Sequence, residues 1–249
     1  MPDKLIETNT SVFLAIGNQR IQRAACVPGE DWWVETVLNE PVKPVTLAAD
    51  PANAAHVFAG TNGKGIYHST DKGETWSHLG LDGQIVKSIA VSPHNSKVIY
   101  AGVKPAAMFK SVDGGHTWAE LDGFRRIPNR WWWFSPAEKP FQPYVMAIAV
   151  SPTEPDVVLA GIEFGAVVRS EDGGRSWSGH RQGAIRDCHS LKFHRALPRR
   201  YSAPGIRWAV SITCPRLPAC RESTSRSWPR WRSRPARRRS RCRCMDHCS

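Results

Sequence analysis

The chain has 249 residues, of which 41% are hydrophobic, and its 34 Lys and Arg against 22 Asp and Glu give a formal net charge of +12. This length suits one domain or two small ones. No apolar run reaches the roughly 18 residues of a membrane-spanning helix, and the opening MPDKLIETNT lacks the apolar stretch of a secretory signal. We therefore expect a cytoplasmic protein without a membrane partner.

The positive charge is confined to the end of the chain. Residues 1–198 contain 20 basic and 20 acidic side chains, whereas residues 199–249 contain 14 arginines, no lysine and two acids. Only Cys26 and Cys188 precede residue 199, so a packed core rather than disulfides must stabilise the first part. We predict a folded body at 1–198 and a disordered, Arg/Cys-rich tail at 199–249.

Three stretches of 30 residues, 47–76, 89–118 and 148–177, align without a gap and share eight identical columns. Within each copy, short runs rich in β-branched and aromatic residues are separated by polar turns, which favours strands over helices. In the second copy we expect strands at 88–92, 97–102, 108–112 and 117–121. Four short antiparallel strands per repeat describe a propeller blade, so the sequence predicts an all-β fold.

Each copy closes on the same turn: STDKGETW from residue 69, SVDGGHTW from 111 and SEDGGRSW from 170. The aspartate can accept backbone N–H bonds, the glycine permits a positive φ, the hydroxyl braces the hairpin, and the tryptophan packs between sheets. We predict that these residues are structural: Ser69, Asp71, Gly73, Trp76, Ser111, Asp113, Gly115, Trp118, Ser170, Asp172, Gly174 and Trp177.

These turns match the Asp box, or BNR repeat, S-x-D-x-G-x-[TS]-W. Over about residues 12–194 the chain resembles the sialidase-like, sortilin-like and xyloglucanase-like family of β-propellers. The resemblance implies four-stranded Asp-box blades and a ligand face opposite the boxes, which are folding motifs away from any catalytic centre. We expect an incomplete propeller of about three to four blades.

Fainter copies flank the three repeats. Residues 12–17 (VFLAIG) parallel 57–60 (VFAG), and 28–35 (PGEDWWVE) occupy the closing-turn position without the box spacing, as in a degenerate first blade. At the other end, 189–194 (HSLKFH) aligns with 146–151 (MAIAVS), but Arg195 stands where the other copies have proline and no box follows near 213. The repeat therefore breaks between about 195 and 204.

Because the repeat breaks off, its blades cannot close a ring by themselves: a propeller closes by bringing its last blade against its first. Either a second chain completes the ring, or the product is truncated. We favour truncation through a shifted reading frame, since GC-rich DNA read out of frame yields Arg, Pro, Ser, Cys and Trp with scarcely any Lys, as in residues 221–244.

The tail allows two other interpretations. Its arginines could contact phosphates while Trp228 or Trp231 stacks on bases, which would make it a nucleic-acid-binding segment. Residues 242–248 (CRCMDHC) place three thiols and His247 together but lack the paired spacing of structural zinc sites. We expect no metal, no cofactor and no nucleic-acid partner.

The second linker between blades stands out on the expected ligand face. Successive boxes are 42 and then 59 residues apart, so this linker carries an insertion that includes FRRIPNRWWWFSP (124–136). Long loops on a rigid scaffold are disproportionately functional. Trp131, Trp132 and Trp133 cannot all face one way, so at least one should reach solvent, a sugar ring or a protein partner; the alternative is a hydrophobic flap over the blade.

Charged residues on the same face are weaker candidates. Arg125 and Arg126 invite comparison with the carboxylate-binding Arg of the sialidase F-R-I-P motif, but here they follow the second box instead of preceding the first. Arg181 and Arg186 could bind an anionic substrate or could be surface charges.

Carboxylates on the loop face are the candidates for catalysis. Hydrolysis of a glycan by paired carboxylates needs two acids about 5 to 10 Å apart. Glu163 and Asp187, with His189 as proton carrier, are the candidates, each with a structural alternative as a loop residue, a turn cap or a strand-start side chain.

The sequence predicts a non-catalytic binding or scaffold propeller that binds a glycan or a protein partner on its loop face. One alternative is a glycoside hydrolase of the BNR type that uses carboxylate acid/base chemistry. A second alternative is nucleic-acid binding through the basic tail.

Overall fold

The computed structural model describes residues 10–39, 41–179 and 188–193. All of them lie in the first of the two units into which the chain divides, Met1–Val210. The predicted boundary at 198/199, the tail and its CRCMDHC cluster lie outside the described residues. In the described part no helix is long and apolar enough to cross a membrane.

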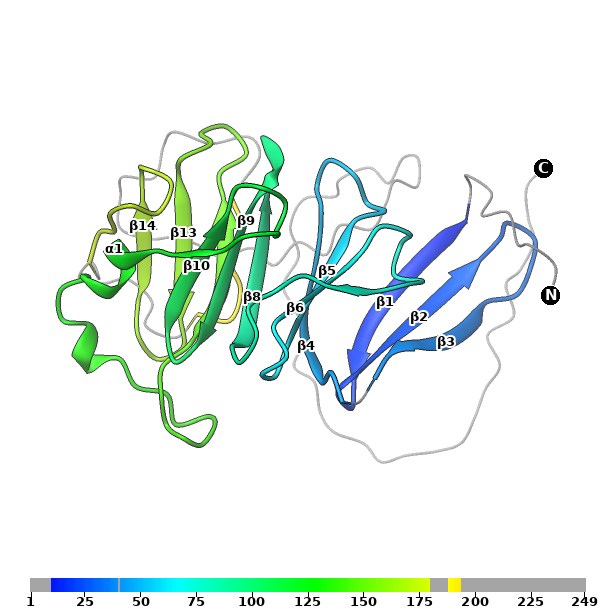
Figure 1. The fold of residues 1–249 in the computed structure, drawn as a ribbon, viewed down its shortest axis with the longest axis horizontal. Helices are drawn as coiled ribbons and strands as arrows, with labels where there is room; N and C mark the ends of the chain where they lie inside the picture. The colour runs from blue at the N-terminus through cyan, green and yellow to red at the C-terminus, as the bar shows by residue number, and fades with distance from the viewer. Residues whose placement is uncertain (1–9, 40, 180–187, 194–249) are drawn as a thin grey trace, which may run out of the picture. The chain divides into compact units, whose positions relative to one another are not determined.

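The described strands form four antiparallel sheets that follow one another along the chain (Figure 1). The first sheet holds β1 (Ser11–Gly17), β2 (Arg20–Cys26) and β3 (Trp33–Leu38). The second holds β4 (Pro44–Ala49), β5 (Val57–Thr61), β6 (Ile66–Ser69) and β7 (Ser77–His78). The third holds β8 (Ile85–Ser92), β9 (Asn95–Lys104), β10 (Ala107–Ser111) and β11 (Ala119–Glu120). The fourth holds β12 (Val145–Val150), β13 (Val158–Ile162) and β14 (Val167–Ser170).

This architecture confirms the predicted all-β fold of consecutive short-stranded blades. Within each sheet, each strand pairs with the next one along the chain, and the expected strands at 88–92, 97–102, 108–112 and 117–121 fall within β8 to β11 or beside them. Two short helical segments were not predicted: α1 (Asp122–Arg125) and the 3-10 turn η1 (Arg130–Trp132). Both lie in the insertion, which has no counterpart in the other repeats to reveal its structure.

Adjacent sheets pack through the glycine of an Ala-Gly pair that recurs in the repeats, as Ala59-Gly60 and Ala101-Gly102. A Cβ on Gly60 would lie 2.7 Å from the Val86 side chain, and one on Gly102 would lie 2.6 Å from that of Val145. Both contacts join the second strand of one blade to the first strand of the next. Because any side chain there would overlap the neighbouring strand, the glycine column sets the close spacing of the sheets.

The three boxes have the same hydrogen bonds. The buried hydroxyl of Ser69, Ser111 or Ser170 accepts a bond from the box glycine N–H at 2.7, 2.7 and 2.8 Å and donates to the aspartate at the same three distances. The box Thr or Ser hydroxyl donates to the other aspartate oxygen at 2.5 Å in each copy. Asp71, Asp113 and Asp172 thus close their own turns, and none of them faces the opposite, loop-bearing end of its blade.

The box tryptophans differ in their neighbours. The Trp118 indole N–H donates to the Leu79 carbonyl of the preceding blade at 3.1 Å, so this ring bridges two sheets as predicted. Trp76 and Trp177 donate to the glycine carbonyls of their own turns, Gly73 and Gly174. Trp177 is also buried, and its ring meets Phe124 of the insertion edge-on at 5.4 Å between centroids.

Because of the box carboxylates, the stability of the fold should depend on pH. The Ser176 hydroxyl and backbone N–H hold the pKa of Asp172 at about 2, and the Thr117 hydroxyl likewise lowers the pKa of Asp113. Since an unfolded aspartate has a pKa of about 3.9, this stabilisation is complete above about pH 4 and is lost as the pH falls from there toward 2.

Urea midpoints measured from pH 7 down to pH 2 should therefore fall most steeply below pH 4. Asp172→Asn should be less stable than the parent at pH 7, and its urea midpoint should fall less than that of the parent on acidification. The matched control is Asp31→Asn, in the exposed turn of the first sheet, which should keep the parent slope. An equal slope in Asp172→Asn and the parent would contradict the role of the boxes.

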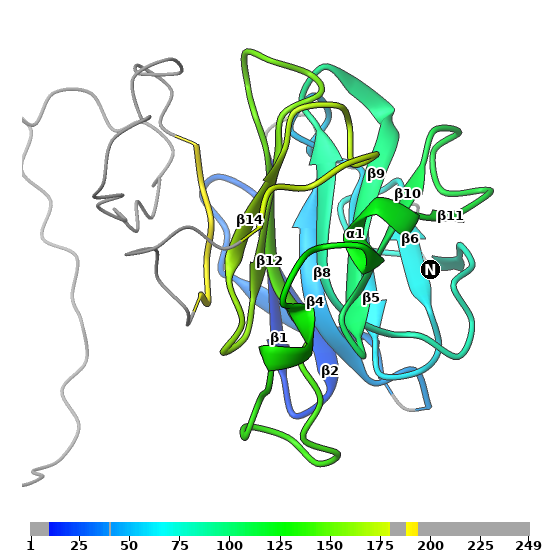
Figure 2. The same cartoon turned by 90° about the vertical axis from the view of Figure 1, so that its left-hand side faces the viewer.

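The first and last copies are the irregular ones. The first sheet has three strands, and its β1–β2 hairpin turns through Asn18 and Gln19, both with positive φ. Residues 188–193, expected to begin a further copy, form no regular strand, but Cys188 and Leu191 are buried against Ala147 and Ala149 of β12. Figure 2 shows this short segment in yellow beside the fourth sheet.

Candidate functional site

The loops opposite the boxes lie together, as the repeat predicted. The linker before each first strand hydrogen-bonds to the loop between the second and third strands of a blade. In the third blade the Ala106 N–H donates to the Pro143 carbonyl at 2.8 Å, and in the fourth the Glu163 N–H donates to the Tyr144 carbonyl at 3.0 Å. These bonds fix the insertion, residues 122–144, against the loop that carries Glu163.

The insertion is anchored by its buried aromatic side. Phe124 has no exposed surface, and Trp133 is 8% exposed with its ring centroid 5.8 Å from that of Phe124. The Arg130 guanidinium lies over both rings, at 5.4 and 5.5 Å, and donates to the Ala106 carbonyl. Burial lowers the pKa of Arg130. Phe124 and Trp133 therefore pack the insertion into the buried cluster of the third and fourth blades.

The other two tryptophans face outward. Trp131 is 75% exposed and Trp132 is 67% exposed, and their rings stack 4.3 Å apart. The expectation that at least one of the three rings reaches solvent thus applies to two of them, while Trp133 takes the alternative role of a flap that covers the blade. The sequence could not assign these roles, because the partners of Trp133 come from other segments.

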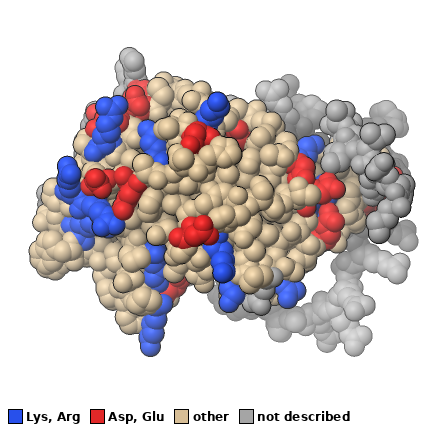
Figure 3. Space-filling model, viewed as in Figure 1, with Lys and Arg blue, Asp and Glu red and all other residues tan. Residues whose placement is uncertain are grey.

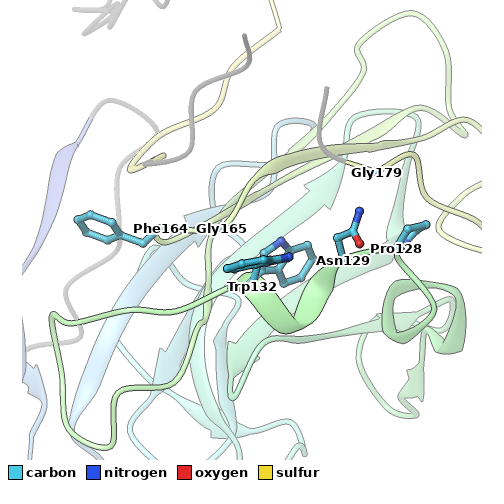
Figure 4. A pocket seen from close by; sticks show the side chains of 7 residues that line it. Pro128, Asn129, Trp132, Phe164, Gly165 and Gly179 are labelled. Carbon is cyan, nitrogen blue, oxygen red and sulfur yellow. The ribbon is translucent and has the colours of Figure 1, made fainter. Parts of the chain in front are cut away.

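A shallow cleft of about 490 Å³ opens between the insertion and the loop after β13. In Figure 4, Trp132 lies across its middle, with Pro128 and Asn129 on one side and Phe164 and Gly165 on the other. The lining residues are Pro128, Asn129, Trp132, Trp133, Phe164, Gly165 and Gly179. Apart from the two indole N–H groups, Asn129 supplies the single polar side chain among these described residues, so this part of the cleft suits an uncharged ligand surface.

Glu163 and His189 come together beside this cleft. The Glu163 side chain is 3% exposed, and its carboxylate lies 3.7 Å from Nδ1 of His189, whose side chain is 63% exposed. The pair is an ion pair when the imidazole is protonated. Asp187, the expected second carboxylate, and Arg181 and Arg186 lie outside the described residues, so the predicted acid pair remains a prediction.

Arg125 and Arg126 do not line the cleft. Both are exposed, and Arg125 forms an ion pair with Glu120, which raises the pKa of the guanidinium mainly through their hydrogen bond. On the face shown in Figure 3, basic and acidic side chains are interspersed. This pattern agrees with the neutral balance of the body and gives no single-sign surface there for a polyanion.

A charged cluster that the sequence did not predict holds the far end of the insertion. Glu138 accepts hydrogen bonds from Nζ of Lys87 at 2.7 and 2.8 Å and lies 3.4 Å from Nζ of Lys104, which is almost fully buried. The hydrogen bond from Lys87 lowers the pKa of Glu138, and both ammonium groups lie over the Tyr144 ring. Lys87 and Glu138 are 51 residues apart, so no local pattern reveals the cluster.

No three His, Cys, Asp or Glu side chains of the described residues are arranged to hold a metal ion.

Comparisons with known proteins give only distant structural likenesses. No family model matches the chain, and no curated protein matches it. Among solved structures, an ancestral GH74 enzyme is 19% identical over 65% of this chain and 22% of its own, with a TM-score of 0.46. YCF48 from Cyanidioschyzon merolae is 20% identical over 58% of this chain and 39% of its own, with a TM-score of 0.42. The GH74 xyloglucanase from Xanthomonas campestris is 17% identical over 71% of this chain and 37% of its own, with a TM-score of 0.38.

The chain therefore spans less than half the length of each of these structures. Its own boxes and sheets determine the fold. The described residues form four consecutive antiparallel sheets with the blade pattern of a β-propeller, and the second, third and fourth of them carry the box turns.

Proposed function

We propose that this chain is a non-catalytic binding protein and that the aromatic surface of the insertion docks an apolar segment of a protein partner. One observation carries the proposal: five of the large exposed hydrophobic side chains of the described residues gather on the insertion and the adjoining loop. They are Trp131, Trp132, Phe134, Phe141 and Phe164, between 47% and 75% exposed. We name them the aromatic surface.

Exposure of this kind is unfavourable unless something covers it. Apolar burial is worth about 25 cal/mol per Å², and a soluble monomer seldom leaves large apolar patches uncovered. Tryptophan and arginine anchors dominate the energetics of protein interfaces. Trp133, Phe124 and Arg130 hold the surface in place from beneath, so it is presented by a packed support rather than by a free loop.

The lining of the cleft favours an apolar protein segment over a charged ligand. Among the described lining residues none is charged, and Asn129 supplies the single side-chain amide. A glycan is the second candidate, because the stacked Trp131 and Trp132 rings form a flat aromatic platform of the kind on which a sugar ring can lie. Recognition of many sugar hydroxyls would need more polar side chains than this cleft offers.

The experiment is a selection with two arms. A displayed peptide library and a glycan array are both probed with the full chain and with the double variant Trp131→Ala/Trp132→Ala. We expect peptides rich in apolar residues to bind the parent chain at least tenfold more tightly than the double variant. Binding of glycans alone would overturn the protein-partner proposal in favour of the second candidate. Glycan cleavage abolished by Glu163→Gln would overturn the non-catalytic assignment.

A further inference from the structure

Two lysines of the third blade hold a carboxylate that comes from the insertion. Lys87 lies in β8 and Lys104 ends β9, and their side chains are 13% and 3% exposed. Nζ of Lys87 donates to both carboxylate oxygens of Glu138, at 2.7 and 2.8 Å. Nζ of Lys104 donates to the Glu138 backbone carbonyl at 3.0 Å and lies 3.4 Å from its carboxylate. Both ammonium groups lie over the Tyr144 ring, 5.1 and 5.6 Å from its centroid. We name Lys87, Lys104 and Tyr144 the lysine site.

An ammonium group as buried as that of Lys104 needs a compensating anion. Taking a charge out of water is costly, and removing one member of a buried ion pair strongly destabilises a fold. The Tyr144 ring face adds only a modest attraction for each cation. Among the described residues, Glu138 is the acid that pairs with both lysines. The lysine site should therefore hold a negative charge whenever the blade is folded.

The carboxylate reaches the lysine site from the solvent side. The Glu138 side chain is 47% exposed, although the lysines that it contacts are nearly covered. The residues around it, 136–142, are all exposed as well. Glu138 is thus a surface residue whose carboxylate closes an otherwise buried pair of cations. A second carboxylate that approaches from solvent can reach the same two ammonium groups once Glu138 leaves.

Glu138 also lies between two members of the aromatic surface. Phe134 and Phe141 flank it in the sequence, and their rings meet edge-on with 6.1 Å between centroids. Nζ of Lys139 lies over the Phe141 ring, 5.9 Å from its centroid. A partner that covers these two phenylalanines therefore contacts the same short loop that carries Glu138, which couples the lysine site to the aromatic surface.

We propose that the lysine site is a carboxylate-binding site, that Glu138 fills it in the free chain, and that an acidic side chain of the docked partner replaces Glu138 there. The last step rests on the function proposed above, whereas the site itself does not. Exchange of one carboxylate for another leaves Lys104 compensated, so it costs little. A partner without an acid gains nothing at this position. The site thus selects, among apolar segments, those that also carry an Asp or a Glu.

The first arm of the test uses acetate, a carboxylate that belongs to no partner. Glu138→Ala should unfold at a lower temperature than the parent chain. Added sodium acetate should recover at least about half of that loss, because a ligand that binds only the folded chain stabilises it. Sodium chloride at the same ionic strength should recover much less. In the matched control Glu120→Ala, which removes a carboxylate from its ion pair with the exposed Arg125, the two salts should act equally. Equal effects of acetate and chloride on Glu138→Ala would overturn the carboxylate site.

The second arm compares peptides that differ in one carboxyl group. Among apolar peptides that bind the parent chain, one with an Asp or a Glu should bind at least tenfold more tightly than the same peptide with Asn or Gln. This preference should vanish in Lys104→Met and in Lys87→Met. Lys87 is the less buried of the two lysines, so Lys87→Met keeps the comparison possible if Lys104→Met does not fold.

The two arms distinguish the failure of each part. Apolar peptides that bind equally well with Asp and with Asn would overturn the exchange and leave the proposed function in place. If no apolar peptide binds the parent chain, the proposed function fails and the exchange fails with it. The response of Glu138→Ala to acetate decides the carboxylate site in either case.

Discussion

Replacing Trp133 by alanine is expected to lower the free energy of unfolding by about 3–5 kcal/mol, the usual cost of truncating a buried large aromatic side chain. Trp133 is 8% exposed and belongs to the same buried cluster as Phe124, Trp177 and Val145. Its loss would leave a cavity beneath the insertion and would remove one of the two rings that lie under Arg130. Urea denaturation followed by circular dichroism measures the change.

The adjacent tryptophans provide the matched control. Trp131 is 75% exposed, so Trp131→Ala should change the free energy of unfolding by less than about 0.5 kcal/mol, as surface substitutions usually do. The two residues are two positions apart in the sequence, but Trp131 is 75% exposed and Trp133 is 8% exposed. Equal effects of Trp131→Ala and Trp133→Ala would show that the insertion is not organised around Trp133.

Gly102→Ala should destabilise the chain by about 1–3 kcal/mol, the cost of overpacking a tight core. The new methyl group would lie 2.6 Å from Cβ of Val145 and 2.5 Å from Oγ of Ser88, which itself donates to the Val145 carbonyl at 2.8 Å. The neighbouring blade would have to move away to accommodate it. Denaturation midpoints measure the loss.

Gly17→Ala is the control for this prediction, because Gly17 also lies in a strand, β1, but is exposed. A Cβ at Gly17 meets no atom within 4 Å. Alanine there should be neutral or slightly stabilising, since it reduces the conformational freedom of the unfolded chain. A destabilisation by Gly17→Ala as large as that by Gly102→Ala would mean that the cost arises within the strand and not from the contact between blades.

The repeats explain how much could be predicted from the sequence. Three aligned boxes predicted the turns, the short strands and the loops that meet at the opposite end, because each of these features recurs at a fixed spacing. The insertion does not recur. Its helical segments α1 and η1, the burial of Trp133 against Phe124, and the ion pairs of Glu138 with Lys87 and Lys104 depend on contacts between distant segments, which periodicity does not encode.

The ends of the repeat show the same limit. The alignment predicted that residues 189–194 begin another copy, and Cys188 does take the position of Val86 and Val145. A regular strand is absent from 188–193, although Cys188 and Leu191 are buried against β12. The position thus follows from local apolar contacts, which do not by themselves form a strand.

The affinity of a selected apolar peptide for four versions of the chain tests the proposed function most directly. These are the parent, Trp131→Ala/Trp132→Ala, and two controls. Val112→Ala alters an exposed apolar side chain in a box turn, at the end of the blade opposite the loops, and Glu163→Gln alters the carboxylate beside the cleft. We predict dissociation constants at least tenfold higher for the double variant alone, equivalent to about 1.4 kcal/mol or more. Equal affinity of the parent and the double variant would contradict the assignment of the aromatic surface as the docking site.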